Sequence, residues 1–438
     1  MLEFLGDTPI LLKISGVFAL VILLIRKKQP IGTAMVAGAF LLGLWCRMSL
    51  REIFTSMATA MFDSKTLLLS IVVILILILS RSLDALDQMK RLLTSFQGLV
   101  NNVRFNLVVF PALIGLLPMP GGAIFSAPMV NELGNDHHLD PEAKSLLNYW
   151  FRHVWEFAWP LYPSVLLASS MASVSLWAFV GHAFPITLIS ISVGYWFLLR
   201  KLPIVSSAPK GTANRTQVFS FFKEMIPVTI VIGGALIGNI GITWFRGTIP
   251  TLASVPNEVP LILSLLVSIL YLWWVNKASG NTIRMILFDK SLIMLIYMIV
   301  AIFIFKEMLV DSHAVTDLSD VLAAQQIPLV VLTMLIPFIV GVISGIAVAF
   351  IGTSFPVLLS LFQTLNLDSH LILPYLILGF CSGFSGVLFS PLHVCLIFTR
   401  EYFGADIQRI YRQLWKPITS LLLGSMLYFW MLVFLAGR

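Results

Sequence analysis

The chain has 438 residues, of which 58% are hydrophobic and 11% are charged, against about 25% charged residues in an average soluble protein. A soluble protein with this balance could not cover its surface with polar groups. The composition therefore excludes a soluble enzyme, a disordered chain and a disulfide-rich secreted scaffold. The apolar runs are continuous rather than alternating, which excludes a membrane β-barrel. The sequence predicts an all-α polytopic membrane protein.

The spanning helices can be placed from the apolar runs, because a membrane span needs about 20 apolar residues. Uninterrupted candidates are residues 8–25, 31–46, 66–80, 174–199, 225–245, 259–275, 288–310 and 417–436. Two longer runs, 146–171 and 371–399, contain Pro160 and Pro391. A proline inside a helix removes a hydrogen bond and clashes with the preceding turn. These two runs are therefore predicted to be broken helices.

Two further runs, 105–130 and 326–362, carry helix breakers in the middle, at Pro118–Gly122 and at Gly341, Gly345 and Gly352-Thr353-Ser354. If they enter and return as re-entrant hairpins, 20 of the 28 Lys and Arg residues fall in cytoplasmic segments and 6 in external ones. This distribution favours ten crossings with both termini external, because cytoplasmic loops are rich in Lys and Arg. Twelve full crossings remain the alternative.

The two halves of the chain share one order: three spans, a hairpin, a broken helix and a final span. Because each half has five crossings, the halves must have opposite orientations. Weak similarity agrees: 111–115 resembles 337–341, and 159–162 resembles 390–393. We predict two inverted repeats: 1–221 (scaffold spans 1–106, hairpin and broken helix 107–199) and 222–438 (scaffold spans 222–325, hairpin and broken helix 326–438). Paired broken helices in inverted repeats are typical of secondary transporters.

Two motifs carry a family resemblance: Leu117-Pro118-Met119-Pro120-Gly121-Gly122-Ala123 with Ser126-Ala127-Pro128-Met129-Val130, and Tyr149-Trp150-Phe151-Arg152-His153-Val154-Trp155-Glu156. Together they resemble a prokaryotic membrane family with a domain of unknown function. That family is grouped with the ion transporter superfamily of gluconate, citrate and dicarboxylate carriers. The resemblance implies an elevator-type transporter fold and a dimeric scaffold. The Ser-Asn-Thr signature of the dicarboxylate branch is absent, so neither that specificity nor sodium coupling carries over.

Ionisable residues precede Pro160 in the first broken helix, where they are costly and usually functional. Arg152 and Glu156 are i,i+4 neighbours on one helix face. One interpretation is a structural ion pair; the other is that Arg152 binds an anion while Glu156 or His153 titrates and couples ion movement. The candidate substrate-binding residues are Pro120, Gly121, Gly122, Arg152, His153, Thr353, Ser354, Ser382, Ser385, Ser390 and His393. Helix starts after the breaks offer unpaired N–H groups that suit an anion.

The remaining reactive residue types indicate no catalytic or metal site. Cys46, Cys381 and Cys395 lie in apolar segments without metal-type spacing and are predicted to be packing residues. His137-His138 lack a helical ligand spacing and are expected in a solvated loop. No cofactor is expected beyond a Na⁺ ion that could accompany the substrate. A nucleic-acid partner is not expected, because the net charge of +7 serves as a topology signal.

The sequence therefore predicts a secondary active transporter of a small organic anion, with a carboxylate as the expected group. We expect it in the cell (inner) membrane as a homodimer, coupled to H⁺ or Na⁺ and moving by an elevator mechanism. A cation/proton antiporter is the first alternative. An intramembrane lipid-handling protein or enzyme is the second.

Overall fold

The computed structural model describes residues 9–97, 99–100, 102–118, 122–202, 215–245, 248–249, 255–324 and 327–437. All regular structure within these ranges is helical. Seven helices in this part of the chain are long and apolar enough to cross a membrane, and four shorter apolar helices accompany them. The expected all-α, multi-pass architecture is thereby confirmed.

The helices follow the apolar runs closely. Up to residue 202 they are α2 (Ile10–Arg26), α3 (Ile31–Trp45), α4 (Leu50–Phe62), α5 (Ser64–Ala85), α6 (Gln88–Phe96), α7 (Val103–Gly115), α8 (Ala123–Asp136), α9 (Pro141–Arg152), the 3-10 helix η1 (Val154–Phe157), α10 (Pro163–Met171), α11 (Leu176–Gly194) and the π-helix η2 (Tyr195–Leu199). From residue 215 they are α12 (Arg215–Phe245), α13 (Val259–Val275), α14 (Gly280–Leu287), α15 (Lys290–Asp311), α16 (Ala314–Ala324), α17 (Leu329–Ser344), α18 (Ala347–Thr364), α19 (Ser369–Phe389), α20 (Val394–Phe403) and α21 (Ile407–Ala436). The predicted boundary between residues 221 and 222 falls inside α12.

Four helices were not predicted: α4, α6, α14 and α16. Each contains several polar or charged residues, so none forms a continuous apolar run. Local capping helps to define the first of them. Ser49 and Glu52 form a reciprocal capping box at the start of α4, which satisfies two backbone N–H groups that have no partner inside the helix.

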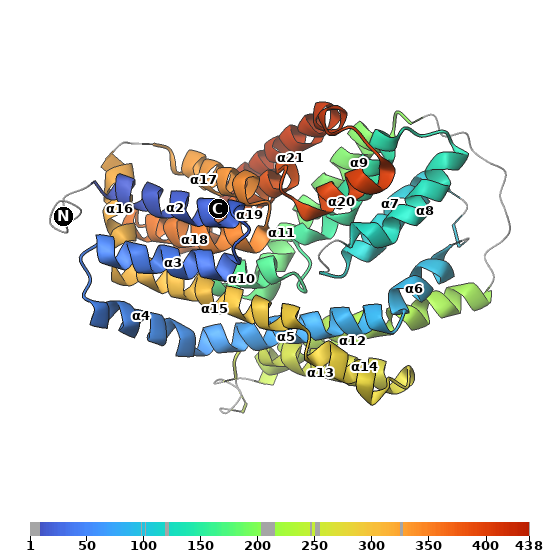
Figure 1. The fold of residues 1–438 in the computed structure, drawn as a ribbon, viewed down its shortest axis with the longest axis horizontal. Helices are drawn as coiled ribbons and strands as arrows, with labels where there is room; N and C mark the ends of the chain where they lie inside the picture. The colour runs from blue at the N-terminus through green and yellow to red at the C-terminus, as the bar shows by residue number, and fades with distance from the viewer. Residues whose placement is uncertain are drawn as a thin grey trace.

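Two helical hairpins lie toward opposite ends of the molecule (Figure 1). The α7–α8 hairpin opens toward the right-hand end in that view, and the α17–α18 hairpin opens toward the left. The second hairpin turns at Gly345, whose φ of 65° closes α17 in the left-handed conformation. Glycine adopts this conformation without strain, and here an added Cβ would also lie 2.9 Å from the His393 backbone nitrogen. The turn of the second hairpin is therefore at residues 345–346.

Both predicted helix breaks are present. The first separates α9 from α10, with η1 and Pro160 between them, and Pro163 then occupies the first turn of α10. The second separates α19 from α20 at Ser390-Pro391. Proline disfavours the helical conformation of the residue before it, but it fits well at a helix start. Proline therefore explains the end of α19 before Pro391 and the start of α10 at Pro163, whereas α9 already ends at Arg152, eight residues before Pro160.

The two hairpins contact their broken helices in matching ways. A Cβ added to Gly115, four residues after Pro111, would lie 2.2 Å from the Arg152 carbonyl oxygen. A Cβ added to Gly341, four residues after Pro337, would lie 2.2 Å from the Gly383 carbonyl oxygen. Arg152 and Gly383 each precede the proline of their break by eight residues. The crossing of α7 with α9 therefore has the same register as the crossing of α17 with α19.

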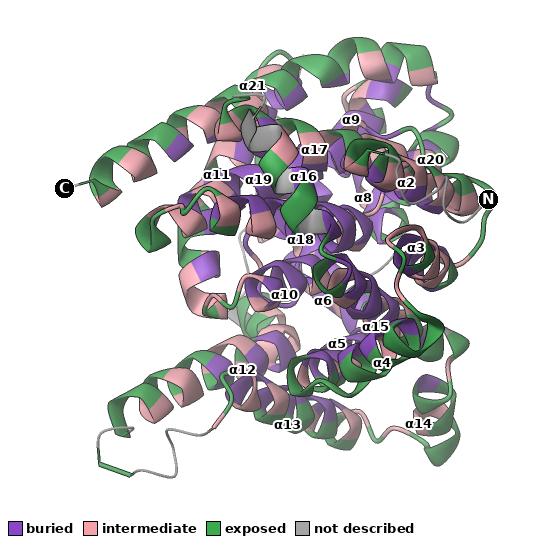
Figure 2. Cartoon of the chain, turned by 90° about the vertical axis from the view of Figure 1, so that its left-hand side faces the viewer, coloured by how far each residue is buried: buried purple, intermediate pink, exposed green. Residues whose placement is uncertain are grey.

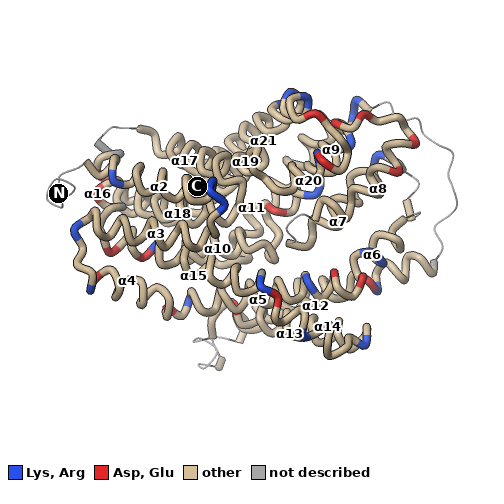
Figure 3. Tube along the Cα trace, in the orientation of Figure 1, with Lys and Arg blue, Asp and Glu red and all other residues tan. Residues whose placement is uncertain are grey.

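Burial and charge agree with this arrangement. In the view of Figure 2 the buried residues gather around α10, α15, α18 and α19, whereas α12, α13 and α21 expose much of their surface. Figure 3 shows long stretches without Lys, Arg, Asp or Glu along α17, α18 and α19. The exposed face of α12 and α13 carries large apolar side chains such as Ile237, Trp244 and Trp274, as expected of surface that faces lipid.

We expect Gly115→Ala and Gly341→Ala each to lower the midpoint of thermal unfolding in detergent. The added methyl group meets a backbone carbonyl that cannot move aside, and overpacking of this kind costs about 1–3 kcal/mol. The matched controls are Gly233→Ala and Gly241→Ala in α12, where an added Cβ meets nothing within 4 Å. These should leave the midpoint unchanged or raise it, since Ala is the better helix former by about 1 kcal/mol. Equal midpoints for all four variants would contradict the close crossings.

Candidate functional site

A cavity of about 370 Å³ lies where the two helix breaks meet the turn of the second hairpin and Pro118 of the first. The first hairpin contributes Pro118, and the second contributes Gly345 and Ile346. Arg152, Glu156 and Tyr162 come from the first break, while His393 and Cys395 come from the second. Four segments that are far apart in the sequence therefore share one cavity.

The opposite wall of the cavity is apolar. It is built by Val73, Ile76 and Leu77 of α5 and by Leu295 and Met298 of α15. Ala347 and Val348 at the start of α18 extend this wall. Most of the polar groups therefore lie on the side of the helix breaks, and Arg81 of α5 is the charged residue on the other side. Ligand sites often have this composition, in which a few polar groups orient an otherwise apolar ligand.

An ion pair joins Arg152 and Glu156 on the polar side. The Arg152 Nη1 atom lies 2.7 Å from Glu156 Oε1, and the two side chains are only 2% and 10% exposed. Arg152 also donates to the Tyr162 hydroxyl at 3.1 Å. The internal ion pair predicted by the structural interpretation is thus formed. Because both residues also line the cavity, the pair remains within reach of a ligand.

Aromatic-ring side chains bond the backbone carbonyls at the ends of the interrupted helices. The Tyr162 hydroxyl donates to the Gly115 carbonyl at 2.6 Å, where α7 ends. His393 Nδ1 lies 2.8 Å from the Gly345 carbonyl, at the end of α17. The Tyr149 hydroxyl donates to the Leu388 carbonyl at 3.0 Å, near the end of α19. Side chains in or near the two breaks therefore provide hydrogen bonds to the terminal backbone carbonyls of α7, α17 and α19.

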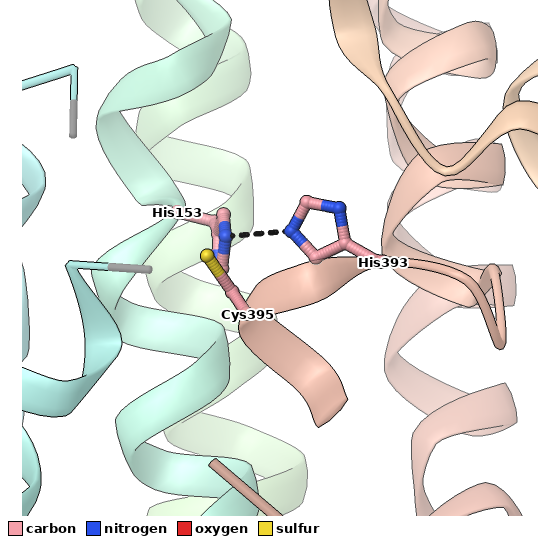
Figure 4. A group of neighbouring side chains, drawn as sticks. All are labelled: His153, His393 and Cys395. Carbon is pink, nitrogen blue, oxygen red and sulfur yellow. Dashed lines mark hydrogen bonds between the residues drawn. The ribbon is translucent and has the colours of Figure 1, made fainter. Parts of the chain in front are cut away.

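The two histidines of the predicted site face each other (Figure 4). Their Nε2 atoms lie 3.0 Å apart, although 240 residues separate them in the sequence. His153 Nδ1 is within hydrogen-bond distance of the Tyr149 carbonyl, and His153 Nε2 is also 3.8 Å from Glu156 Oε1. His153 is 1% exposed. The structure thus joins one residue from each predicted repeat in a direct contact.

Two further residues complete this region, and the sequence does not single them out for it. Cys395 follows His393 by two positions and is buried, as predicted, but its sulfur lies beside the two imidazoles. Arg81 of α5 lies on the cavity wall with a 40% exposed side chain, 3.7 Å from Asp289. Neither position could be predicted from the sequence, because the spatial neighbours of Cys395 and Arg81 belong to distant segments and no local spacing indicates the contact.

Several predicted site residues lie elsewhere. Pro120 and Gly121 lie outside the described residues, and Gly122 is buried just before α8. Thr353 and Ser354 are buried in α18, well after the turn at 345–346, where Thr353 donates to the Ala349 carbonyl. Ser382 and Ser385 donate to the carbonyls of Met334 and Cys381. Ser390 accepts from the Leu392 backbone N–H. None of the described members of this group lines the cavity.

The position of Thr353 and Ser354 corrects one expectation. Gly352 precedes them and was a possible site for the turn of the hairpin. Its Cα instead packs against Ile302, because an added Cβ would lie 2.7 Å from that side chain. Gly352 is thus a close-packing residue inside a continuous helix. His137 and His138 lie in the α8–α9 loop, as expected; His137 is partly exposed and His138 is exposed.

The family model described as "Protein of unknown function (DUF401)" matches residues 10–431. The chain belongs to the DUF401 family. The resemblance to a membrane family with a domain of unknown function is thereby confirmed. The relation to gluconate, citrate and dicarboxylate carriers stays a prediction. No curated protein matches this DUF401 chain in sequence.

Among solved structures, the DUF401 chain is similar to the YdaH transporter of Alcanivorax borkumensis, which is described as having an unusual topology. The two share 16% sequence identity, with a TM-score of 0.60. The similarity covers 88% of this chain and 89% of that one. At this level of identity the comparison establishes a shared fold.

We expect Arg152→Ala to destabilise the protein strongly, because it leaves the buried Glu156 carboxylate without its cation. Breaking a buried pair by removing one partner costs about 3–5 kcal/mol. The double variant Arg152→Ala/Glu156→Ala should recover most of the lost thermal stability. Arg409→Ala is the control: its 71% exposed side chain lies 3.9 Å from Glu142, and exposed pairs contribute only about 0–1 kcal/mol. A double variant less stable than Arg152→Ala would argue against this pairing.

Proposed function

We propose that this DUF401 protein is a secondary active transporter of a small organic anion, with a carboxylate as the expected group. The proposal rests on one observation: two helix breaks, the turn of the second hairpin and Pro118 of the first hairpin meet at one cavity that contains a buried arginine. Irregular backbone at membrane depth is tolerated where it is buried or lines a cavity. In secondary transporters, substrate sites are typically formed by discontinuous helices of this kind.

The cavity has the size and chemistry for such a substrate. A volume of about 370 Å³ lies within the usual range of small-molecule sites, about 300–1,000 Å³. Two arginines, Arg81 and Arg152, and one carboxylate, Glu156, line it, so with neutral histidines its charge is positive. The apolar wall formed by α5 and α15 adds a surface for a hydrocarbon group. These features favour an anion with an apolar body over a small inorganic ion.

The matching helix crossings support two inverted repeats, although the boundary predicted from sequence, between 1–221 and 222–438, falls inside α12. Gly115 and Gly341 occupy equivalent positions against their broken helices. Tyr162 and His393, two residues after the prolines of their breaks, each bond a glycine carbonyl at the end of a hairpin helix. Repeats of opposite orientation offer a direct route to alternating access, because each can adopt the conformation of the other.

We further propose an elevator motion in which the scaffold spans of 1–106 and 222–325 stay fixed and form a homodimer in the cell (inner) membrane. The packing within each group supports this division. α3 packs on α15, and α12 packs on α13. The hairpins and broken helices pack mainly on one another, through α7 with α9, α17 with α19, and α19 with α21. The cavity lies between these groups, with α5 and α15 on the scaffold side.

The alternatives have less support. A cation/proton antiporter needs acidic groups at its centre, and Glu156 is the carboxylate that lines this cavity among the described residues, already paired with Arg152. An intramembrane enzyme or lipid-handling protein would use His153, Glu156 and His393. Uptake assays distinguish these alternatives from an anion transporter, since an antiporter moves cations without an organic anion and an enzyme changes its substrate chemically.

The test is uptake by proteoliposomes that contain the purified full-length protein. A panel of radiolabelled carboxylates with apolar groups of increasing size would be offered, with and without pH or Na⁺ gradients. We expect uptake of at least one carboxylate and acceleration by one of the two gradients. Arg152→Lys should reduce uptake about tenfold or more, because a bidentate fork is replaced by a point charge. Arg409→Lys, on an exposed helix, serves as the control.

We also expect Arg81→Gln to raise the KM for the anion and to leave the maximal rate nearly unchanged. Arg81 lies on the partly exposed side of the cavity, where a positive charge attracts an anion before it is bound, an effect that weakens with ionic strength. The measurement is the initial uptake rate against substrate concentration at low and high salt.

A wild-type transport rate in the Arg152→Ala/Glu156→Ala double variant would leave Arg152 with a structural role only.

A further inference from the structure

The two facing imidazoles have fixed tautomers. His393 Nδ1 lies 2.8 Å from the Gly345 carbonyl, and His153 Nδ1 contacts the Tyr149 carbonyl. A carbonyl oxygen only accepts hydrogen bonds, so each Nδ1 carries the hydrogen. In a neutral imidazole the other nitrogen, Nε2, then presents a lone pair. These two Nε2 atoms are 3.0 Å apart. Two lone pairs at this distance repel each other unless a cation lies between them.

A third ligand atom lies in the same place. The Cys395 sulfur and the ligand nitrogens of His153 and His393 all lie within 4.8 Å of one another. Figure 4 shows the sulfur and the His393 ring approaching the His153 ring from the neighbouring segment. In tetrahedral zinc sites the Zn–N and Zn–S distances are about 2.0–2.1 and 2.3 Å. In such a site the nitrogens are about 3.3 Å apart, and a nitrogen and the sulfur are about 3.6 Å apart. The present separations, 3.0 Å between the nitrogens and up to 4.8 Å within the group, therefore need side-chain shifts of about 1 Å.

We infer that His153, His393 and Cys395 bind one thiophilic transition-metal ion of the zinc class. Imidazole and thiolate together favour zinc and copper(I) over calcium or magnesium, which prefer oxygen ligands. This inference stands on the geometry of the three ligands and does not depend on the transported substrate. It also assigns a shared role to residues that sequence reasoning treated separately.

The surroundings of the three residues match those of known metal ligands. Histidines that bind metals almost always donate their other ring N–H to a carboxylate or a backbone carbonyl, which fixes the ring. Both histidines make such a contact here, to Tyr149 and to Gly345. The Tyr149 ring also packs against both imidazoles, with ring centroids 4.8 and 5.7 Å away. The ligands are therefore held by a preformed shell.

The site has an open side. His393 and Cys395 both line the 370 Å³ cavity, which gives an ion a path to its ligands. Three protein ligands leave the fourth tetrahedral position for another group, as in zinc sites that bind water or substrate. Glu156 Oε1, 3.8 Å from His153 Nε2, or an oxygen of a molecule in the cavity could occupy it.

Metal content is the first test. The full-length protein, purified in detergent without chelators, should retain about one zinc ion per chain. After the metal is removed with a chelator, addition of Co²⁺ should produce tetrahedral d–d absorption and a thiolate-to-cobalt charge-transfer band. These measurements use the wild-type protein and do not depend on whether any variant folds. Absence of both the retained zinc and the charge-transfer band would overturn the inference and leave a proton between the imidazoles.

Variants identify the ligands. Cys395→Ser should remove the charge-transfer band and weaken Co²⁺ and Zn²⁺ binding by about 100-fold or more, since even loss of a partner outside the ligand set costs about 10- to 100-fold. His393→Gln should weaken binding similarly. Cys381→Ser is the matched control, because Cys381 is also buried but lies in α19 outside the three-residue group. Equal spectra for Cys395→Ser and Cys381→Ser, in proteins that elute as single species, would show that Cys395 is no ligand.

Discussion

The central part of this molecule is governed by the need to satisfy backbone carbonyls at interrupted helix ends. The last carbonyls of a helix have no partner within it, and in an apolar environment each unsatisfied group costs several kcal/mol. Here ring-bearing side chains meet that need: Tyr162 bonds the end of α7, His393 the end of α17, and Tyr149 the end of α19. The same hydrogen bonds orient the rings, so the positions of the polar groups in the cavity follow from the need of these backbone carbonyls for hydrogen-bond donors.

Sequence reasoning succeeded where the determinant was local. α19 ends just before Pro391 and α10 begins at Pro163, because proline acts on its own turn. The continuous apolar runs become α2, α3, α5, α11, α12, α13, α15 and α21. Sequence reasoning left the turn of the second hairpin unplaced among Gly341, Gly345 and Gly352, because glycine has two possible uses. Gly345 forms a turn with positive φ, whereas Gly352 packs against Ile302 inside α18. Nothing in the sequence near either glycine distinguishes a turn from a close packing contact.

The candidate site was only partly predictable for a similar reason. Arg152 and Glu156 are four residues apart, so helical periodicity alone predicts their ion pair. The contact between His153 and His393 joins residues 240 positions apart and depends on how the two broken helices meet. Cys395 had no distinguishing spacing, because its metal-type neighbours include one from the other half of the chain. The two halves also contribute unequally: the position equivalent to Arg152 is Gly383, so this charge comes from one side only.

The long separation between the two imidazoles has a consequence for biosynthesis. The Arg152–Glu156 pair can form as soon as α9 and η1 leave the ribosome, since both partners lie on one short segment. His153 must wait until residue 393 has been synthesised, which at about 5–20 residues per second means a delay of about 10–50 s. During that interval the first half resides in the membrane with an imidazole that lacks its final neighbour. A nascent chain arrested before α20 would therefore have a neutralised arginine but an unfinished centre, and membrane quality control would have a structural difference to detect.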